Sequence, residues 1–466
     1  MTMPGKQDII RRFIDEGLAK QRAGDFGGAL TLYNKVLNIA PDSEELRFLV
    51  AECLLRLECN GLAVNVLQNL VRDNPDNSRA WCNLGVAYGK EGFVDDAESA
   101  WLRAIELDGD SEQVCGNLAG LFADSGHPEK AVAWGNRALD CNPDSIQARW
   151  HRGLARLAMH EFAAGWDDYE IRKEMPSWNP RRRIEAAEWA GEALSPESRL
   201  YLHGEQGLGD EILFLALIPR VIERVGEARI TVEVGRKLAG LVEHTWPDVE
   251  VLADEGAATG RYTHKAALGS LPRLFWRDRG DIGGEPYLVP DPERQASYTR
   301  QLEALGPRPW VALAWFGGVK ATNLLGRSVS LSVFGPLREA CTCVSGQYED
   351  VQPVGTVLSR KRREAGLPML DIDSAGADAM AQAALFACCD AVVTVPQTAL
   401  HVAGAVGARC YVLVPDAPDW RLGTGAADMP YYRSVRLVGK GADGSWESRL
   451  ADIAAELSSG SRAAGP

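Results

Sequence analysis

The sequence lacks any uninterrupted apolar run of about eighteen residues, the length that a membrane-spanning helix needs. Its first segment, residues 1–17, becomes charged and amphipathic at once and has no apolar core of the kind found in signal peptides. It also lacks a basic excess: the formal net charge is −14, which opposes a broad electrostatic grip on nucleic acid or anionic lipid. We therefore expect a soluble, cytoplasmic protein with no nucleic-acid partner and no membrane span.

Metal-binding and disulfide patterns are missing as well. The ten cysteines form no CxxC pair, and the seven histidines form no paired cluster. The cysteines are scattered through apolar runs, which is typical of reduced core thiols and less so of metal ligands or disulfides. We expect no metal site.

A period of 34 residues runs through the first third of the chain. Small residues recur at this spacing in two columns, and a third column of Pro41, Pro75 and Pro143 has Gly109 in the place of its missing proline. Small residues let two helices approach closely, and proline ends a helix because it cannot continue the backbone ladder. The two columns are Gly17, Ala51, Gly85, Ala119 and Gly153, and Ala29, Ala63, Ala97, Ala131 and Gly165.

The best repeat unit, residues 81–88 followed by Ala97, Trp101 and Ala104, closely resembles the tetratricopeptide consensus. Five units begin near residues 10, 44, 78, 112 and 146, and predict an all-α solenoid over residues 1–172. The concave face of such a solenoid usually receives an extended or helical peptide of another protein. The alternative is a helical repeat that only spaces domains or dimerises.

The remaining sequence predicts an α/β region. Residues 173–198 are rich in prolines, charges and isolated tryptophans and read as a linker, after which short β-branched runs alternate with helical stretches, as in parallel sheets. The segment at 306–310 divides this region into lobes at 199–305 and 306–456, and residues 457–466 read as a disordered tail. We expect strands at 200–203, 229–234, 249–252, 310–315, 341–345, 390–395 and 410–414.

The sharpest local feature is the sequence GEQGLGDEILF at 204–214, a glycine-rich turn between a strand and a helix. It is not the dinucleotide fingerprint, because isoleucine occupies position 212 where a third glycine is needed. Asp210 is expected at the N-cap of the helix, where a carboxylate would repel a phosphate. It is either an ordinary capping residue or a base at the edge of a cleft, and the glycines favour the base because they let substrate approach the backbone.

Two further segments carry candidate binding residues. The helix that begins near Gln397 and Thr398 has no acid at its start, so its free N–H groups suit an anion such as a diphosphate. His401, one turn later, is either a phosphate or ribose contact or a buried, satisfied histidine. The loop after the strand at 310–315 carries Lys320 and Arg327, which either neutralise a leaving phosphate or are surface charges. The basic runs 181–183 and 360–363 are interpreted as solvated loop charges.

Together these segments resemble bacterial proteins that join tetratricopeptide repeats to a two-lobed, Rossmann-like glycosyltransferase domain of the GT-B type, related to heptosyltransferases and similar to flagellin glycosyltransferases. The resemblance rests on GEQGLGDEILF, on WFGG to RSVSL, on SGQ at 345–347, on CDAVVTVPQTALHVAGAVG, and on PDWR at 418–421 and MPYYRSVRL at 429–437. It implies Asp210 as the general base and Arg327 as a contact of the donor diphosphate. Substrate contacts are expected from Gln206, Gly207, Gly209, Trp315, Gly317, Lys320, Asn323 and Gln347, and nucleotide contacts from Gln397, Thr398, His401, Gly404, Trp420 and Arg421.

The activity that this resemblance implies is inverting, metal-independent transfer of a sugar from a nucleotide-sugar to a protein acceptor, such as flagellin, that the repeats recruit. No cofactor is expected besides the nucleotide-sugar co-substrate. Related sequences often have Asp-Thr where this chain has Gln397-Thr398, and Ser-Leu-Gln where it has Ser-Gly-Gln at 345–347. The first difference supports an alternative, a non-catalytic adaptor with a degenerate second half. A third interpretation is an epimerase of the same architecture, which would need no protein acceptor.

Overall fold

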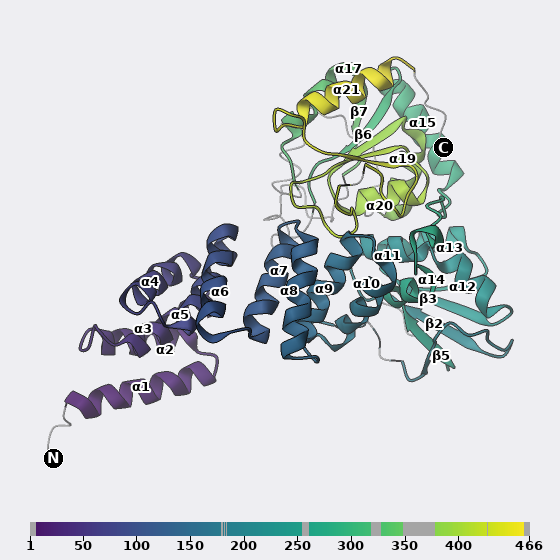
Figure 1. Ribbon diagram of the computed structural model, residues 1–466. Helices are drawn as coiled ribbons and strands as arrows, with labels where there is room; N and C mark the ends of the chain where they lie inside the picture. Colours follow the sequence, from purple (N-terminus) through teal and green to yellow (C-terminus); the bar gives the residue numbers. More distant parts are fainter. Residues whose placement is uncertain are drawn as a thin grey trace. The chain divides into compact units, whose positions relative to one another are not determined.

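The computed structural model describes residues 6–178, 180, 182, 184–253, 261–317, 328–347, 378–425 and 427–460. The chain divides into two compact units, Met1–Ala155 and Arg156–Pro466. The first consists of helices, and the second contains two parallel sheets with helices around them (Figure 1). Within the described ranges, no helix has both the length and the apolar character needed to cross a bilayer.

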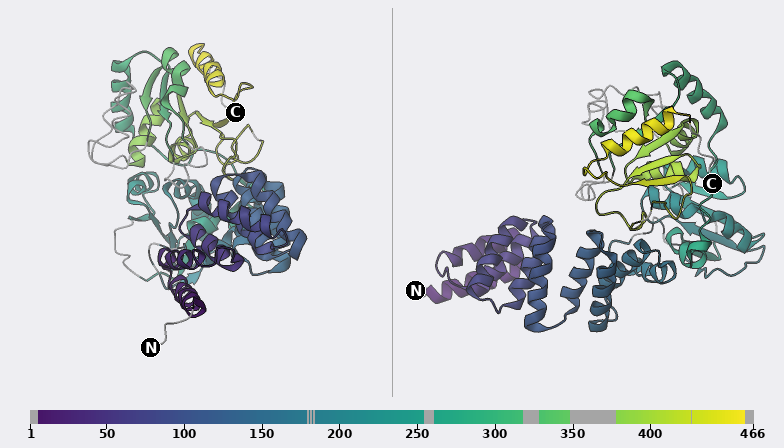
Figure 2. Two further views of the ribbon diagram at one scale, coloured as in Figure 1. Left: turned by 90° about the vertical axis from the view of Figure 1, so that its left-hand side faces the viewer. Right: turned by 45° about the horizontal axis from the view of Figure 1, so that its top comes forward.

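The first unit is built of helical hairpins (Figures 1 and 2). Consecutive helices pair, α1 with α2, α3 with α4, α5 with α6 and α7 with α8, and α9 runs across the boundary between the units. The helices are α1 (Lys6–Arg22), α2 (Phe26–Leu37), α3 (Glu44–Arg56), α4 (Asn60–Asp73), α5 (Ser78–Glu91), α6 (Val94–Asp108), α7 (Glu112–Asp124), α8 (Pro128–Cys141) and α9 (Ile146–Ala158).

One feature that repeats every 34 residues is a polar side chain that caps the start of a helix. Ser43, Asn77, Ser111 and Ser145 stand one period apart, and the side-chain oxygen of each accepts a hydrogen bond from the backbone N–H three residues later. Such caps satisfy one of the N–H groups that a helix start leaves unpaired. The same polar cap therefore precedes α3, α5, α7 and α9.

The small-residue columns allow close helix contact, as predicted. A Cβ atom on Gly85 of α5 would lie 2.5 Å from Nε1 of Trp101 on α6. The Trp101 indole N–H instead donates to the carbonyl of Cys82 at 3.0 Å, which joins the two helices of one hairpin.

The second unit contains two five-stranded sheets whose strands are all parallel, with orders β1-β5-β2-β3-β4 and β10-β9-β8-β6-β7. The first sheet consists of β1 (Ala187–Glu188), β2 (Arg199–His203), β3 (Arg229–Val234), β4 (Glu250–Ala253) and β5 (His264–Ala267). The second consists of β6 (Trp310–Ala314), β7 (Thr342–Ser345), β8 (Ala391–Thr394), β9 (Cys410–Leu413) and β10 (Val435–Val438).

Helices cover these sheets. On one face of the second sheet, alternate strand residues such as Val311, Val393 and Tyr411 pack with residues of α17 and α21. The α-helices are α10 (Phe162–Tyr169), α11 (Leu208–Leu215), α12 (Ile218–Val225), α13 (Arg236–Thr245), α14 (Leu271–Phe275), α15 (Pro292–Leu305), α17 (Gly335–Ala340), α19 (Ala379–Cys388), α20 (Thr398–Ala405) and α21 (Glu447–Ser458). Short 3-10 turns are η1 (Glu170–Glu174), η2 (Leu268–Ser270), η3 (Arg279–Asp281) and η4 (Leu331–Phe334).

The predicted fold class, an all-α repeat followed by a two-part α/β region, is confirmed. All seven predicted strands are present within one residue at each end, whereas β1, β5 and β10 were not predicted. The two compact units divide after residue 155, and α10 packs within the second. The predicted extent of the repeats, residues 1–172, stays a prediction. Residues 457 and 458, assigned to a disordered tail, instead belong to α21, and residues 461–466 lie outside the described ranges.

Candidate functional site

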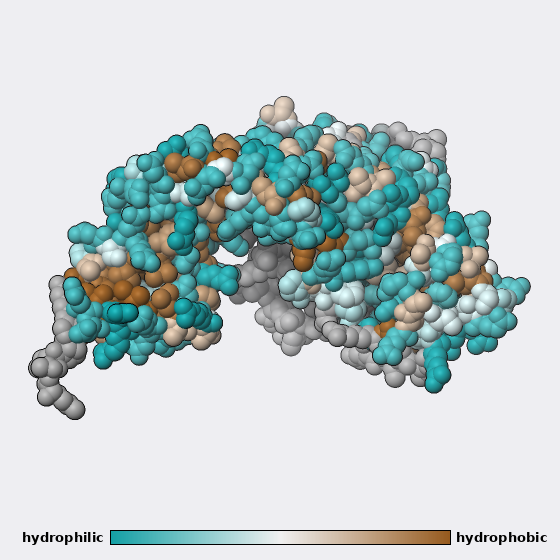
Figure 3. Space-filling view, turned by 60° about the horizontal axis from the view of Figure 1, so that its bottom comes forward, coloured by the Kyte–Doolittle hydropathy of each residue, from teal (hydrophilic) through white to brown (hydrophobic). Residues whose placement is uncertain are grey.

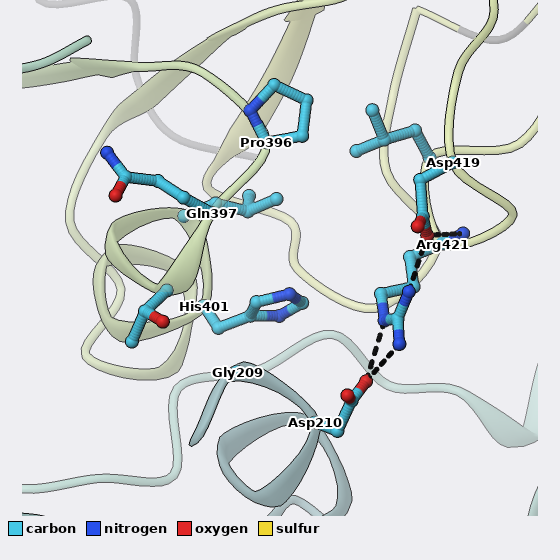
Figure 4. Close-up of a pocket in the computed structure, with 10 residues that line it drawn as sticks. Gly209, Asp210, Pro396, Gln397, His401, Asp419 and Arg421 are labelled. Carbon is cyan, nitrogen blue, oxygen red and sulfur yellow. Dashed lines mark hydrogen bonds and ion pairs between the residues drawn. The ribbon is translucent and has the colours of Figure 1, made fainter. Parts of the chain in front are cut away.

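A small pocket of about 140 Å³ lies in the second unit, where α11, the start of α20 and the loop around Asp419 approach one another (Figure 4). Helices α11 and α20, which follow strands of different sheets, pack together beside it. This is the position in which parallel α/β sheets usually bind ligands, outside the carboxyl ends of the strands. The lining residues are Gly209, Asp210, Pro396, Gln397, Thr398, Leu400, His401, Asp419, Arg421 and Leu422.

Asp210 lies in the first turn of α11 and not at its N-cap. The N-cap is Gly207, whose extended backbone leads into the helix and which provides no side-chain cap. The prediction of Asp210 as the capping residue was therefore wrong by three positions. Its carboxylate instead accepts hydrogen bonds from Nε, at 2.8 Å, and Nη2 of Arg421.

Arg421 lies between two carboxylates. Its Nη1 donates to Asp419 at 2.7 Å while Nε and Nη2 donate to Asp210, and its guanidinium also lies 4.3 Å from the ring centroid of Trp420. Burial alone would lower the pKa of Arg421, but the two carboxylates outweigh it and raise that pKa. The arginine is thus permanently charged.

The start of α20 forms the opposite wall. Gln397 is its N-cap with an extended backbone, no side chain caps the helix, and no acid stands in its first turn. The Gln397 side chain is held from two sides, since its Oε1 accepts from Gln347 at 3.2 Å and its Nε2 donates to Thr394 at 3.3 Å. The anion-binding character of this helix start stays a prediction.

His401 is buried, as one of its two interpretations predicted. Its Nδ1 lies 3.0 Å from the hydroxyl of Tyr432, and burial lowers its pKa to about 3, so the ring is neutral at physiological pH. The ring also lines the pocket, and a Cβ atom on Gly209 would lie 3.0 Å from its Cδ2. Glycine at position 209 therefore allows α11 to approach α20 closely.

Several predicted residues lie around the pocket without lining it, so far as the described residues show. Gln347 lies at the carboxyl end of β7, where its side chain accepts from the backbone N–H groups of Trp315 and Phe316 and donates to the Phe316 carbonyl. The Trp315 side chain belongs to the core on the α17 and α21 face. Gly317 donates to Ser328 at 3.2 Å.

Two others pack in the interior. Gly404 faces the ring of Tyr432, which occupies the space that a Cβ would need. Trp420 is buried against Trp166 and Tyr169. Their neighbours Arg421 and His401 line the pocket.

Three predicted residues, Lys320, Asn323 and Arg327, lie outside the described ranges, and their placement stays a prediction. Conversely, Asp419 was not singled out, although it stands within PDWR and binds Arg421. Gln206 is placed beside α11, where its side chain bonds to Tyr169.

The first unit has a groove of its own, about 300 Å³ in volume, lined by residues of α3, α5, the end of α6 and α7. The guanidinium of Arg79 lies 4.3 Å from the ring centroid of Phe48 on α3. Asn83 and Glu52 add polar groups to the lining of the groove. The surface in Figure 3 is mainly hydrophilic with apolar side chains gathered in a few areas.

Comparison with known proteins supports the repeat assignment. Residues 21–81 match one family model of the tetratricopeptide repeat, and residues 60–112 and 87–146 match another. The hairpins of the first unit are therefore tetratricopeptide repeats. The chain is also similar to solved structures including a tetratricopeptide-repeat protein, TTC0263 of Thermus thermophilus (20% identity, 36% of this chain and 91% of that one, TM-score 0.32). MamA of Desulfovibrio magneticus RS-1 is 17% identical over 36% of this chain and 90% of its own, with a TM-score of 0.31.

One similar protein aligns with both units. Protein FlbA of Caulobacter vibrioides is 28% identical over 94% of this chain and 83% of its own length. The similarity therefore extends over both units of this chain.

Proposed function

We propose that the second unit is a glycosyltransferase of the GT-B type and that it transfers a sugar from a nucleotide-activated donor to a protein acceptor. The observation that carries this proposal is the position of Asp210 beside Arg421, in a pocket that also contains the uncapped start of α20. A carboxylate, a cation and a helix start are the groups that an inverting transfer needs for its proton, its leaving phosphate and its nucleotide.

In this mechanism Asp210 accepts the proton of the acceptor hydroxyl as the oxygen attacks the anomeric carbon of the donor. The bond from that carbon to the donor phosphate breaks, and the electron pair leaves with the phosphate. Arg421 and the N–H groups at the start of α20 stabilise the negative charge that develops there. Arg327 and Lys320 are further cations for the same phosphate on the basis of sequence.

Arg421 also controls the availability of the base. A carboxylate that accepts two hydrogen bonds from a guanidinium is poorly placed to accept a substrate proton. A pocket of about 140 Å³ is smaller than the roughly 300–1,000 Å³ typical of ligand sites. Donor entry therefore widens the pocket, draws Arg421 toward the phosphates and releases Asp210.

The repeats supply the acceptor. A protein bound in the groove of the first unit would be held at high local concentration for the attached transferase. Flagellin is the acceptor that the sequence resemblance suggests.

The test is transfer to purified flagellin from a panel of nucleotide-sugars, followed by intact-mass measurement. Wild-type protein should add the mass of one or more sugars, whereas Asp210→Asn should fold normally and lose at least about 100-fold in rate, as expected for loss of a general base. Glu223→Gln, an exposed carboxylate on α12, is the matched control and should retain the full rate. Transfer by Asp210→Asn at the wild-type rate would refute the assignment of the base.

A non-catalytic adaptor is the competing function, supported by Gln397 in place of the usual acid. Calorimetry with a panel of nucleotides separates the two. An adaptor with an inactive pocket should bind none of them, whereas a transferase should bind the nucleotide of its donor.

A further inference from the structure

Helix α10 follows the repeat pattern in its sequence but packs in the second unit. In sequence it continues the 34-residue period through Gly165, as the second helix of a fifth repeat. In the structure it belongs to the second compact unit, and its last residue, Tyr169, is buried beside the candidate site. The sequence of α10 is thus that of a repeat helix, although the helix packs in the unit that carries the candidate site.

We propose that Tyr169 is a positioning residue that holds two catalytic loops in place. Its contact with Gln206 fixes the loop that leads to Asp210, and its contact with Trp420 fixes the loop that carries Arg421. The inference rests on the proposed transferase function and extends it to a residue that does not touch substrate.

On the Asp210 side the contact is a pair of hydrogen bonds. The Tyr169 hydroxyl lies 2.9 Å from Oε1 of Gln206, to which it donates, and 2.7 Å from Nε2, from which it accepts. Gln206 directly precedes Gly207, the N-cap of α11, and Asp210 follows in the first turn. A shift of Gln206 therefore moves the start of the helix that carries the base.

The preceding residue of this loop is fixed as well. The Glu205 carboxylate accepts from Nε and Nη2 of Arg172, at 2.9 and 2.6 Å, and from the indole N–H of Trp178 at 2.6 Å. Arg172 belongs to η1, which follows α10 directly, and both members of the ion pair are buried. Two consecutive loop residues are thus bound by one short segment of chain.

On the Arg421 side the contact is aromatic. The Tyr169 ring centroid lies 5.9 Å from that of Trp420, and Trp166, one turn earlier on α10, packs edge-on against Trp420 at 5.5 Å. The guanidinium of Arg421 lies over the Trp420 ring in turn. The Tyr169 side chain therefore contacts Gln206, four residues before Asp210, and Trp420, the residue directly before Arg421.

This arrangement suits positioning and not proton transfer. Burial raises the pKa of the Tyr169 hydroxyl well above its ordinary value, so it remains a neutral donor and acceptor. The expected contribution is geometric, because displacement of a catalytic group by about 1 Å can cost up to about 100-fold in rate.

The test compares full-length Tyr169→Phe with Tyr33→Phe. Tyr33 is the matched control, because it is a buried tyrosine of the first unit whose hydroxyl also donates to a glutamine, Gln21, at 2.9 Å. Tyr169→Phe removes both hydrogen bonds to Gln206 and should lower kcat by about tenfold, through misplacement of the base, while changing the donor KM less than about twofold. Amide hydrogen exchange at residues 207–213 should quicken by a similar factor.

Two further comparisons separate positioning from general stability. Gln206→Leu should reproduce the Tyr169→Phe exchange effect, and the double variant should show no additional effect, because both remove the same interaction. Tyr33→Phe should lower the melting temperature without changing kcat or exchange at 207–213. Wild-type kcat and exchange in Tyr169→Phe would overturn the proposal.

The exchange measurement also works without an acceptor. If the wild-type protein transfers no sugar, the transferase function fails, yet faster exchange at 207–213 in Tyr169→Phe would still support the positioning role and unchanged exchange would reject it.

Discussion

The Arg421 guanidinium holds the carboxylate of Asp210, a residue 211 positions earlier in the chain, through two hydrogen bonds. This pair joins a loop of the second sheet's lobe to the first turn of α11. Asp419, two residues before Arg421 on the same loop, binds the same guanidinium. Arg421 is therefore shared between Asp419 and Asp210, the proposed base. In the proposed mechanism the donor phosphate competes with Asp210 for this cation.

The first prediction concerns the replacement of Arg421. Arg421→Met removes the guanidinium that binds both Asp210 and Asp419, and it should destabilise the second unit by about 1–3 kcal/mol, between the values for exposed and fully buried ion pairs. Transfer should fall at least about 100-fold, because the leaving phosphate loses its partner. Arg421→Lys keeps the charge without the fork of donors and should recover part of the stability but little of the rate. Denaturant unfolding and transfer assays measure both effects, and equal rates for the Lys variant and wild type would contradict the role of the fork.

The second prediction is a loss of stability in acid. Burial lowers the pKa of His401 to about 3 and that of His203 to about 4, against an ordinary value of 6.5. Between these values and 6.5 the unfolded chain binds protons that the folded unit excludes, so stability falls as pH falls from about 6.5 toward 4 and is fully present above 6.5. The slope is at most about 1.4 kcal/mol per pH unit for each histidine.

Urea unfolding of the second unit at several pH values between 7.5 and 4.5 measures this slope. His401→Gln, which keeps a hydrogen-bonding partner for Tyr432, should flatten the curve, and the exposed His244→Gln should leave it unchanged. A curve of the same slope in His401→Gln and wild type would show that another group causes the acid sensitivity.

The strands were predictable because most of them are short apolar runs between turns, a pattern that buried parallel strands impose on the sequence. β5, with the sequence HKAA, and the two-residue β1 have no such pattern. They exist because β2 and β5 offer backbone partners along their edges, a property of the assembled sheet.

The site was predictable only in its local parts. The glycine-rich turn before Asp210 and the helix start at Gln397 are visible as motifs, whereas the Asp210–Arg421 pair depends on how two lobes meet. Tyr169 was assigned to the repeats because the period continues through Gly165, and only its contacts with Gln206 and Trp420 assign it to the site. The period of a sequence therefore identifies a helix of repeat type, but the packing of that helix determines the domain to which it belongs.

A third prediction tests the small-residue column of the repeats. Gly85→Ala places a methyl group against Trp101 and should strain its hydrogen bond to Cys82, at a cost of about 1–3 kcal/mol to the first unit. Gly116→Ala on α7 meets no atom within 4 Å and should instead stabilise by up to about 1 kcal/mol, because alanine favours helix. Thermal unfolding followed by circular dichroism compares the two, and a stabilising Gly85→Ala would contradict the close-contact explanation.

The last prediction separates acceptor binding from catalysis. Asn83 lies in the groove of the first unit beside Arg79 and Phe48, where its side-chain amide can both donate to and accept from a peptide backbone. Asn83→Ala should weaken binding of the acceptor protein about tenfold, the loss expected for one or two hydrogen bonds, and raise the acceptor KM by a similar factor. The donor KM and nucleotide affinity should not change, because the proposed nucleotide site lies in the second unit. The exposed Asn65→Ala on α4 is the control. Calorimetry with flagellin and with nucleotides measures both sites, and unchanged acceptor affinity in Asn83→Ala would remove this groove as the place where the acceptor is held.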